Sequence, residues 1–201
     1  MTPRPLADRL GIYQGRLVPS TNGELQCAPG PRWREEFALA GSLGFAHVEL
    51  LVERVPDPDA PLWTERGRDE IRAAAVEHGL RLVSLCCDEP LSTPLTEAAT
   101  AASLGARLGP VTEGLGLRTV VLPLAEASEP HRAGCEELVA GVRAVAAALG
   151  DTVVALEGSG SAKLDAELVD AVDEAHVGLC YDLGNATAAG FDPAVEIRAL
   201  G

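Results

Sequence analysis

The sequence predicts an α/β fold in which helices pack against a buried parallel sheet, and three observations support this. Six short apolar runs alternate with longer segments of helical periodicity along the 201 residues. Glycines stand where these helical segments end and the next run begins. Apolar residues make up 47% of the chain but aromatic residues only 3%, so alanine, valine and leucine must form most of the core, as is typical of a parallel sheet covered by helices.

The predicted elements follow one another in a regular order. The strand candidates are residues 10–15, 46–52, 80–87, 117–124, 152–158 and 177–184. Between them, apolar residues recur at spacings of three and four in residues 31–44, 64–79, 95–116, 131–150 and 162–175, which predicts amphipathic helices. Pro31 and Thr64 are predicted helix starts. Predicted helix ends are marked by Gly44, Gly79, Gly116 and Gly150.

Repeated strand and helix units favour right-handed crossovers and a parallel sheet, for which two architectures are open. One is a doubly wound sheet and the other is a (β/α)8 barrel. The turn after the first strand, "YQGRLVPSTNGELQ", lacks the GxGxxG pattern of a dinucleotide fold. The residues at the strand ends therefore have to distinguish the two architectures, since the functional residues of a barrel lie at the carboxyl ends of several strands.

Composition limits the class of protein. The length fits a single domain over residues 1–201. Thirty acidic and 16 basic residues give a net charge of −14, which argues against nucleic acid as a partner. No segment has the length of a signal peptide core or a membrane span. Five cysteines without a CxxC pair are expected to be reduced, so we expect a cytoplasmic protein. They are Cys27, Cys86, Cys87, Cys135 and Cys180.

Polar residues follow most of the predicted strands. Carboxylates and amides that converge at one edge of a sheet suit a divalent cation such as Mg²⁺, Mn²⁺ or Zn²⁺. These residues are Gln14 and Arg16 after the first strand, Glu49 and Glu53 at the second, Asp88 and Glu89 after the third, Glu157 at the fifth, and Asp182 and Asn185 after the sixth.

Each of these positions also has a purely structural interpretation. Asp182 and Glu157 are equally consistent with helix capping or a solvated surface. Glu49 alternates with Val48 and Leu50, so it lies on the opposite face of its strand, either at an edge or in the mouth of a barrel.

Loop roles are open for the remaining candidates. Gln14 and Arg16 either brace a loop or contact a ligand, with Arg16 as the candidate anion contact. Asp88 and Glu89 precede Pro90 and are typical of a turn.

Three stretches carry a resemblance to a known family. "GIYQGRLVPSTNGELQCAPGPRWREEFALAGSLGFAHVELLVE" resembles the opening of the sugar phosphate isomerase/epimerase family, whose members are xylose isomerase-like barrels. "VVALEG" and "VGLCYDLGNATAAGFDPAVEIRALG" are similar to its fifth and sixth strands. The resemblance implies a (β/α)8 TIM barrel that interconverts or epimerises sugars or sugar phosphates through an enediolate.

The resemblance also implies roles for individual residues. Such enzymes hold one divalent metal (Mn, Mg or Zn) with four side chains from strands five to eight. Glu157 matches the first ligand and is also a candidate for one of the two carboxylates that remove and return the proton from the two faces of the substrate. Asp182 matches the second ligand, and the sequence shows no second acid–base carboxylate. Asn185 stands where many relatives have a histidine that contacts substrate. Gln14, Arg16 and Glu49 are the remaining candidate substrate contacts.

Six units form only part of an eight-stranded barrel. The family pattern continues with a seventh strand that carries a histidine ligand and an eighth that carries a second glutamate. We therefore expect a fragment, or a short form completed by another chain, with impaired activity alone. Two exposed sheet edges favour a homo-oligomer. Alternative functions are a non-catalytic binding or assembly module, or a metal-dependent hydrolase of the same superfamily.

Overall fold

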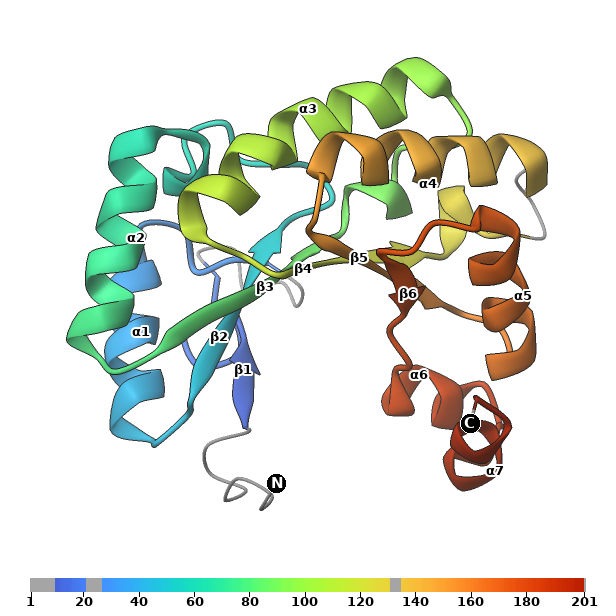
Figure 1. Ribbon diagram of the computed structural model, residues 1–201. Helices are drawn as coiled ribbons and strands as arrows, with labels where there is room; N and C mark the ends of the chain where they lie inside the picture. Colours follow the sequence, from blue (N-terminus) through green and yellow to red (C-terminus); the bar gives the residue numbers. More distant parts are fainter. Residues whose placement is uncertain (1–9, 21–26, 131–134, 201) are drawn as a thin grey trace.

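A computed structural model describes residues 10–20, 27–130 and 135–200, which contain a six-stranded parallel sheet (Figure 1). Its strands are β1 (Gly11–Tyr13), β2 (His47–Val52), β3 (Arg81–Cys87), β4 (Thr119–Leu124), β5 (Val153–Gly158) and β6 (Val177–Leu179). They lie side by side in sequence order. A doubly wound sheet reverses its order at a switch point, whereas barrel strands follow one another around the barrel. The order therefore selects the barrel, here as an open arc of six strands.

Helices cover the outer face of this arc (Figure 1). They are α1 (Trp33–Ser42), α2 (Glu65–Glu77), α3 (Ala98–Leu115), α4 (Cys135–Leu149) and α5 (Ala162–Val172), followed by α6 (Leu183–Ala188) and α7 (Pro193–Leu200) beyond β6. Short 3-10 segments lie in the connections: η2 (Gly30–Arg32), η3 (Pro61–Trp63), η4 (Glu89–Leu91) and η5 (Glu126–Ser128). No helix in the described ranges is long and apolar enough to cross a membrane.

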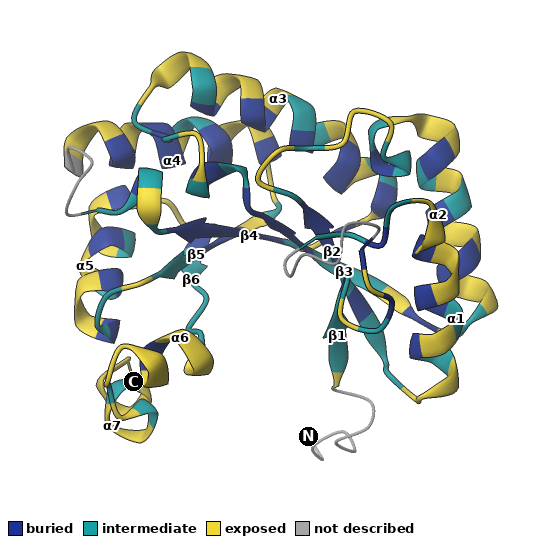
Figure 2. Ribbon diagram, turned by 180° about the vertical axis from the view of Figure 1, so that it is seen from behind, coloured by how far each residue is buried: buried dark blue, intermediate teal, exposed yellow. Residues whose placement is uncertain are grey.

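Two apolar clusters lie on opposite faces of the sheet. The larger one joins strand residues such as Leu50 and Leu122 with helix residues such as Phe37 and Leu108. In Figure 2, buried positions lie on the strands and along the helices that pack against them. The smaller one, which we call the lumen cluster, consists of Cys86, Val121 and Ala155, with Tyr13 and Cys180 packed against it.

Helix boundaries follow the predicted signals. The four predicted glycines all have positive φ angles, of 60° to 82°, which suits residues without a Cβ. Thr64 caps α2, because its Oγ1 accepts a hydrogen bond from Gly67 N at 3.0 Å. Pro31 lies in η2, immediately before α1 begins at Trp33. The predicted fourth helix is described from Cys135 onward, so residues 131–134 of that prediction lie outside the described part.

The predicted sixth strand, 177–184, is too long. β6 ends at Leu179, and Leu183 and Gly184 already belong to α6. The physical reason is Asp182, which caps that helix and so converts the end of the apolar run into a helix start.

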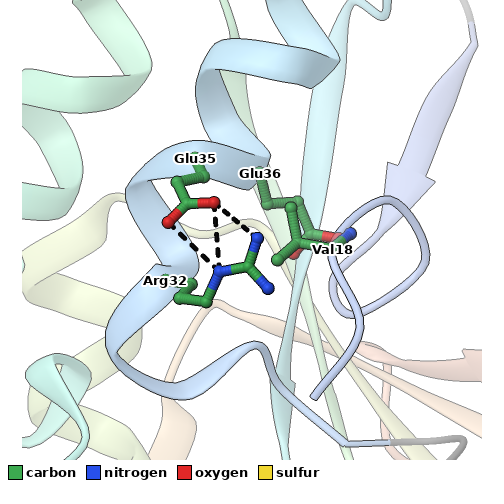
Figure 3. A network of polar contacts seen from close by, with 4 residues as sticks. All are labelled: Val18, Arg32, Glu35 and Glu36. Carbon is green, nitrogen blue, oxygen red and sulfur yellow. Dashed lines mark hydrogen bonds and ion pairs between the residues drawn. The ribbon is translucent and has the colours of Figure 1, made fainter. Parts of the chain in front are cut away.

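A buried carboxylate shapes the loop after β1. Glu36 of α1 is completely buried, and its oxygens accept hydrogen bonds from Gly15 N at 2.9 Å, Leu17 N at 2.9 Å and Val18 N at 3.4 Å. Figure 3 shows Glu36 turned toward Val18, whereas its neighbour Glu35 turns to Arg32. Charged acceptors make stronger hydrogen bonds than neutral ones. Glu36 therefore fixes the backbone course from β1 toward α1.

Glu36→Ala is expected to lower the free energy of unfolding by about 3 kcal/mol, because several loop amides lose their shared acceptor inside the protein. Urea denaturation at pH 7 measures this. Glu35→Ala is the matched control, since Glu35 is exposed and bonded only to Arg32 in the contacts described for it. It should leave the urea midpoint almost unchanged. Equal losses in the two variants would contradict the assigned role of Glu36.

Candidate functional site

Four acidic residues lie on or after four strands. Asp88 follows β3, Glu157 lies near the end of β5, Asp182 follows β6, and Glu49 lies in the middle of β2, paired with the last residue of β1. Because all strands are parallel, the carboxyl ends of β3, β5 and β6 share one edge of the sheet. The charges of Glu49, Asp88 and Asp182 all act on Glu157, so the four carboxyl groups share one acidic region, which we call the acidic mouth.

Glu157 is the most strongly perturbed carboxyl group of the acidic mouth. Its pKa is raised to about 7, first by burial and then by the negative charges of Asp182, Asp88 and Glu49 and by a hydrogen bond with Asp182. Two carboxyl groups that approach this closely share a proton unless a cation separates them. Glu157 can therefore hold or release a proton close to neutral pH.

Asp182 acts as a helix cap in this structure. Its Oδ1 accepts hydrogen bonds from Gly184 N at 2.6 Å and Asn185 N at 2.9 Å at the start of α6. Both bonds end on the same oxygen atom. The cap interpretation is thus confirmed for Oδ1, while the metal-ligand role of Asp182 stays a prediction.

Asn185 supports Glu157 directly. Its Nδ2 donates a hydrogen bond to Glu157 Oε1 at 3.0 Å, and its side chain is exposed on the first turn of α6. Sequence reasoning placed Asn185 as a substrate contact. The structure brings it to the predicted acid–base group, where its amide orients one oxygen of the carboxyl group.

Glu49 faces away from the larger core, as the alternation of its strand predicts. Val48 and Leu50 belong to that core, whereas Glu49 is half-buried and its Oε2 accepts a hydrogen bond from Ser84 Oγ at 2.6 Å. Burial raises the pKa of Glu49, and the bond from Ser84 opposes that rise. Its charge also acts on Tyr13, so it faces the concave side of the arc.

Gln14 and Arg16 occupy the loop after β1. Gln14 is buried, and its Oε1 accepts a hydrogen bond from Leu51 N at 3.1 Å, so it braces β1 against β2. Arg16 is exposed, with Cζ 5.2 Å from the centroid of the Tyr13 ring, and its charge lowers the pKa of Asp88. Substrate contact stays a prediction for both.

Asp88 was one of the strand-end candidates, with a turn as its favoured interpretation. The turn is confirmed, since Asp88 precedes η4, but its carboxyl group is buried beside Cys86 of the lumen cluster. Cys86 and Asp88 are two residues apart, and residues at this spacing on a strand share a face. That periodicity is the signal that favours the concave face for Asp88.

The acidic mouth fits part of a metal-binding site. No group of three or more His, Cys, Asp or Glu side chains in the described ranges is arranged to hold a metal ion. Glu157 and Asp182 nevertheless form a pair whose repulsion a cation would relieve, and carboxylate oxygens are the ligands that Mg²⁺ and Mn²⁺ favour. The residues present therefore fit two positions of a ligand set.

Comparison with protein families gives a match over most of the chain. A family model described as xylose isomerase-like TIM barrel matches residues 37–201. No curated protein matches the sequence.

Several solved structures share the fold. They include a xylose isomerase domain protein from Planctomyces limnophilus (17% identity, TM-score 0.68, covering 94% of this chain and 68% of that one). Another is a xylose isomerase-like TIM barrel protein from Mycobacterium smegmatis in complex with magnesium (18%, 0.66, 88% and 65%). A third is D-allulose 3-epimerase from Methylomonas sp. (15%, 0.67, 94% and 68%). The chain spans about two thirds of the length of these structures.

The raised pKa of Glu157 predicts a pH-dependent stability in metal-free buffer. The folded state binds the proton more tightly than the unfolded state does, so this contribution is complete below about pH 4.5 and is lost as the pH rises through about 7. Because Glu157 is half-buried, we expect a loss of about 1–2 kcal/mol between pH 5 and 8. Urea denaturation with EDTA should show this loss in wild type and not in Glu157→Gln. Identical pH profiles would refute the assignment.

Proposed function

The chain belongs to the xylose isomerase-like TIM barrel family, and on that premise we propose that it handles a sugar or sugar phosphate as an isomerase or epimerase. We also propose that residues 1–201 form one domain. The observation that carries the proposal is the coupling of Glu157 to Asp182 at the carboxyl ends of β5 and β6. Glu157 can exchange a proton, and the two neighbouring carboxyl groups of Glu157 and Asp182 together favour binding of a cation.

Glu157 and Asp182 would hold the divalent cation. When bound, such a cation polarises a carbonyl oxygen and makes the neighbouring C–H group more acidic. Asp182 can contribute while α6 stays capped, since both cap bonds end on Oδ1. The M. smegmatis protein with the same fold was solved in complex with magnesium, which supports this choice of cation.

Glu157 is the proposed acid and base. Asn185 donates to Oε1, so Oε2 is the oxygen we assign to the proton of the substrate carbon. Without the cation, the pKa of Glu157 is raised to about 7, so this carboxyl group can both hold and release a proton near neutral pH. Removal of that proton next to a carbonyl is the step that isomerisation and epimerisation share, and return of a proton to the opposite face, which epimerisation requires, would need a second group.

Cation binding tests the pair. Wild-type protein titrated with Mn²⁺ at pH 8 and followed by electron paramagnetic resonance should bind about one ion per chain. Glu157→Gln and Asp182→Asn should each weaken binding at least about tenfold, since each loses a charged ligand. Asn at position 182 remains a good helix cap, so α6 should persist. Asp170→Asn, an exposed position on α5, is the control.

The outcomes separate the candidate functions. Loss of binding in both site variants with normal binding in Asp170→Asn supports the isomerase proposal. Failure of wild type to bind Mn²⁺ at any concentration would favour a non-catalytic binding or assembly module. The observation that favours this second function is that the described ranges contain no group of three or more side chains arranged to hold a metal ion.

Proton abstraction has its own readout. Ketohexoses incubated with the protein and Mg²⁺ in D₂O should gain deuterium at the carbon next to the carbonyl, as measured by proton NMR after the metal is removed. Glu157→Gln should slow this exchange by about 100-fold or more, because general acid–base groups contribute at least that factor. Exchange at the wild-type rate in Glu157→Gln would assign the proton transfer to another group.

A further inference from the structure

Three arginines line an open groove outside the acidic mouth, which we call the arginine groove. Its walls come from the loop after β2, η3, α2, η4 and α3, and its volume is about 810 Å³. The basic residues are Arg54, Arg68 and Arg107, and among the described lining residues the one acidic side chain is Glu89. Three arginines against one glutamate leave a net charge of +2, although the whole chain carries −14.

The guanidinium groups of Arg68 and Arg107 both lie close to Trp63, another residue of the groove. Arg107 Cζ is 5.7 Å from the centroid of the Trp63 ring. Arg68 Nη1 donates a hydrogen bond at 3.0 Å to the carbonyl oxygen of Leu62, the residue before Trp63. A Cβ at Gly114 would lie 2.6 Å from Arg68 Nε, so the Arg68 side chain crosses from α2 to α3. Two positive charges therefore converge on one part of the groove.

These charges are not cancelled at the surface. Arg68 forms no ion pair with any residue in the described part of the chain. Arg107 is paired with Glu89, but the Glu89 side chain is only 14% exposed, whereas that of Arg107 is 37% exposed. The carboxylate thus lies deeper than the guanidinium group, and Arg107 is the partner that the groove presents to solvent.

Both guanidinium groups keep hydrogen-bond donors for a ligand. In the contacts described, Arg107 uses Nη2 for Glu89 and Arg68 uses Nη1 for Leu62 O. A guanidinium group has five N–H donors in a planar fork, which matches two oxygens of one phosphate group. A phosphate monoester carries close to two negative charges at neutral pH, equal in size to the net charge of the groove. The Trp63 ring offers an apolar wall for the organic part of such a molecule.

We propose that the arginine groove binds the phosphate group of a phosphate monoester, with the organic part of the molecule against Trp63. None of the four residues of the acidic mouth is among the described lining residues of the groove. The inference therefore goes beyond the proposed function and does not depend on it.

Ligand-observed NMR of the full chain with phenyl phosphate, at low salt and with EDTA, tests the proposal. Phenyl phosphate has no carbonyl group to isomerise, so its binding is independent of the chemistry at the acidic mouth. Wild type should bind it at least several-fold more tightly than benzoate, which has a similar ring but a single negative charge.

Three variants locate the binding. Arg68→Gln should weaken phenyl phosphate binding about tenfold, since it removes a charged donor. Arg66→Gln is the matched control, because it removes the same charge from the same helix at a side chain that is 91% exposed and does not line the groove. Its affinity should change less than about twofold. Glu89→Gln should strengthen binding several-fold, because it removes a negative charge from the groove while its amide oxygen can still accept from Arg107.

Several results would overturn the inference. Equal weakening in Arg68→Gln and Arg66→Gln would mean that the ligand responds only to the charge of the whole protein. Benzoate that binds as tightly as phenyl phosphate, or wild type that binds neither, would exclude a phosphate site. Unchanged affinity in Glu89→Gln would do the same for the groove, and the expected gain in this variant cannot arise from misfolding.

Discussion

The hydrogen bonds accepted by the buried carboxylate of Glu36 are the interaction on which the loop after β1, at one side of the site, depends. Glu36 gathers the amides of the loop after β1, and this loop would otherwise carry unsatisfied donors under α1. With the loop fixed, Gln14 reaches Leu51 N and Arg16 lies over Tyr13. A single side chain on a helix thus holds the loop that follows the first strand, from which Gln14 and Arg16 extend.

Much of the fold was predictable from local patterns. Hydrophobic periodicity predicts the six strands and the helices between them. The ends of four helices are predicted by glycines, which readily adopt the positive φ angles found there. Strand order was not predictable from these patterns alone, because doubly wound sheets and barrels use the same local units. The end of β6 was misplaced because Asp182 acts through bonds to residues after it, so an apolar run continued past the true strand.

Part of the site was also predictable from local patterns. Glu157 and Asp182 stand directly at strand ends, and the structure couples them, although a role in metal binding stays a prediction. Glu36 could not be identified from sequence, since its partners lie about 20 residues away and contribute only backbone amides. Asp88 looked like an ordinary turn residue next to Pro90. Its burial depends on the lumen cluster, which forms only when distant strands come together.

Through Asp182, the stability of α6 depends on whether a ligand occupies the site beside Glu157. The same carboxyl group holds the first amides of a six-residue helix and lies against Glu157. So short a helix has little stability of its own, and its cap is a large share of it. An ion bound through Oδ2 would hold the Asp182 side chain in place while Oδ1 caps α6, and would therefore make the helix open less often. Amide exchange at Ala186 and its neighbours would then report occupancy of the site from outside it.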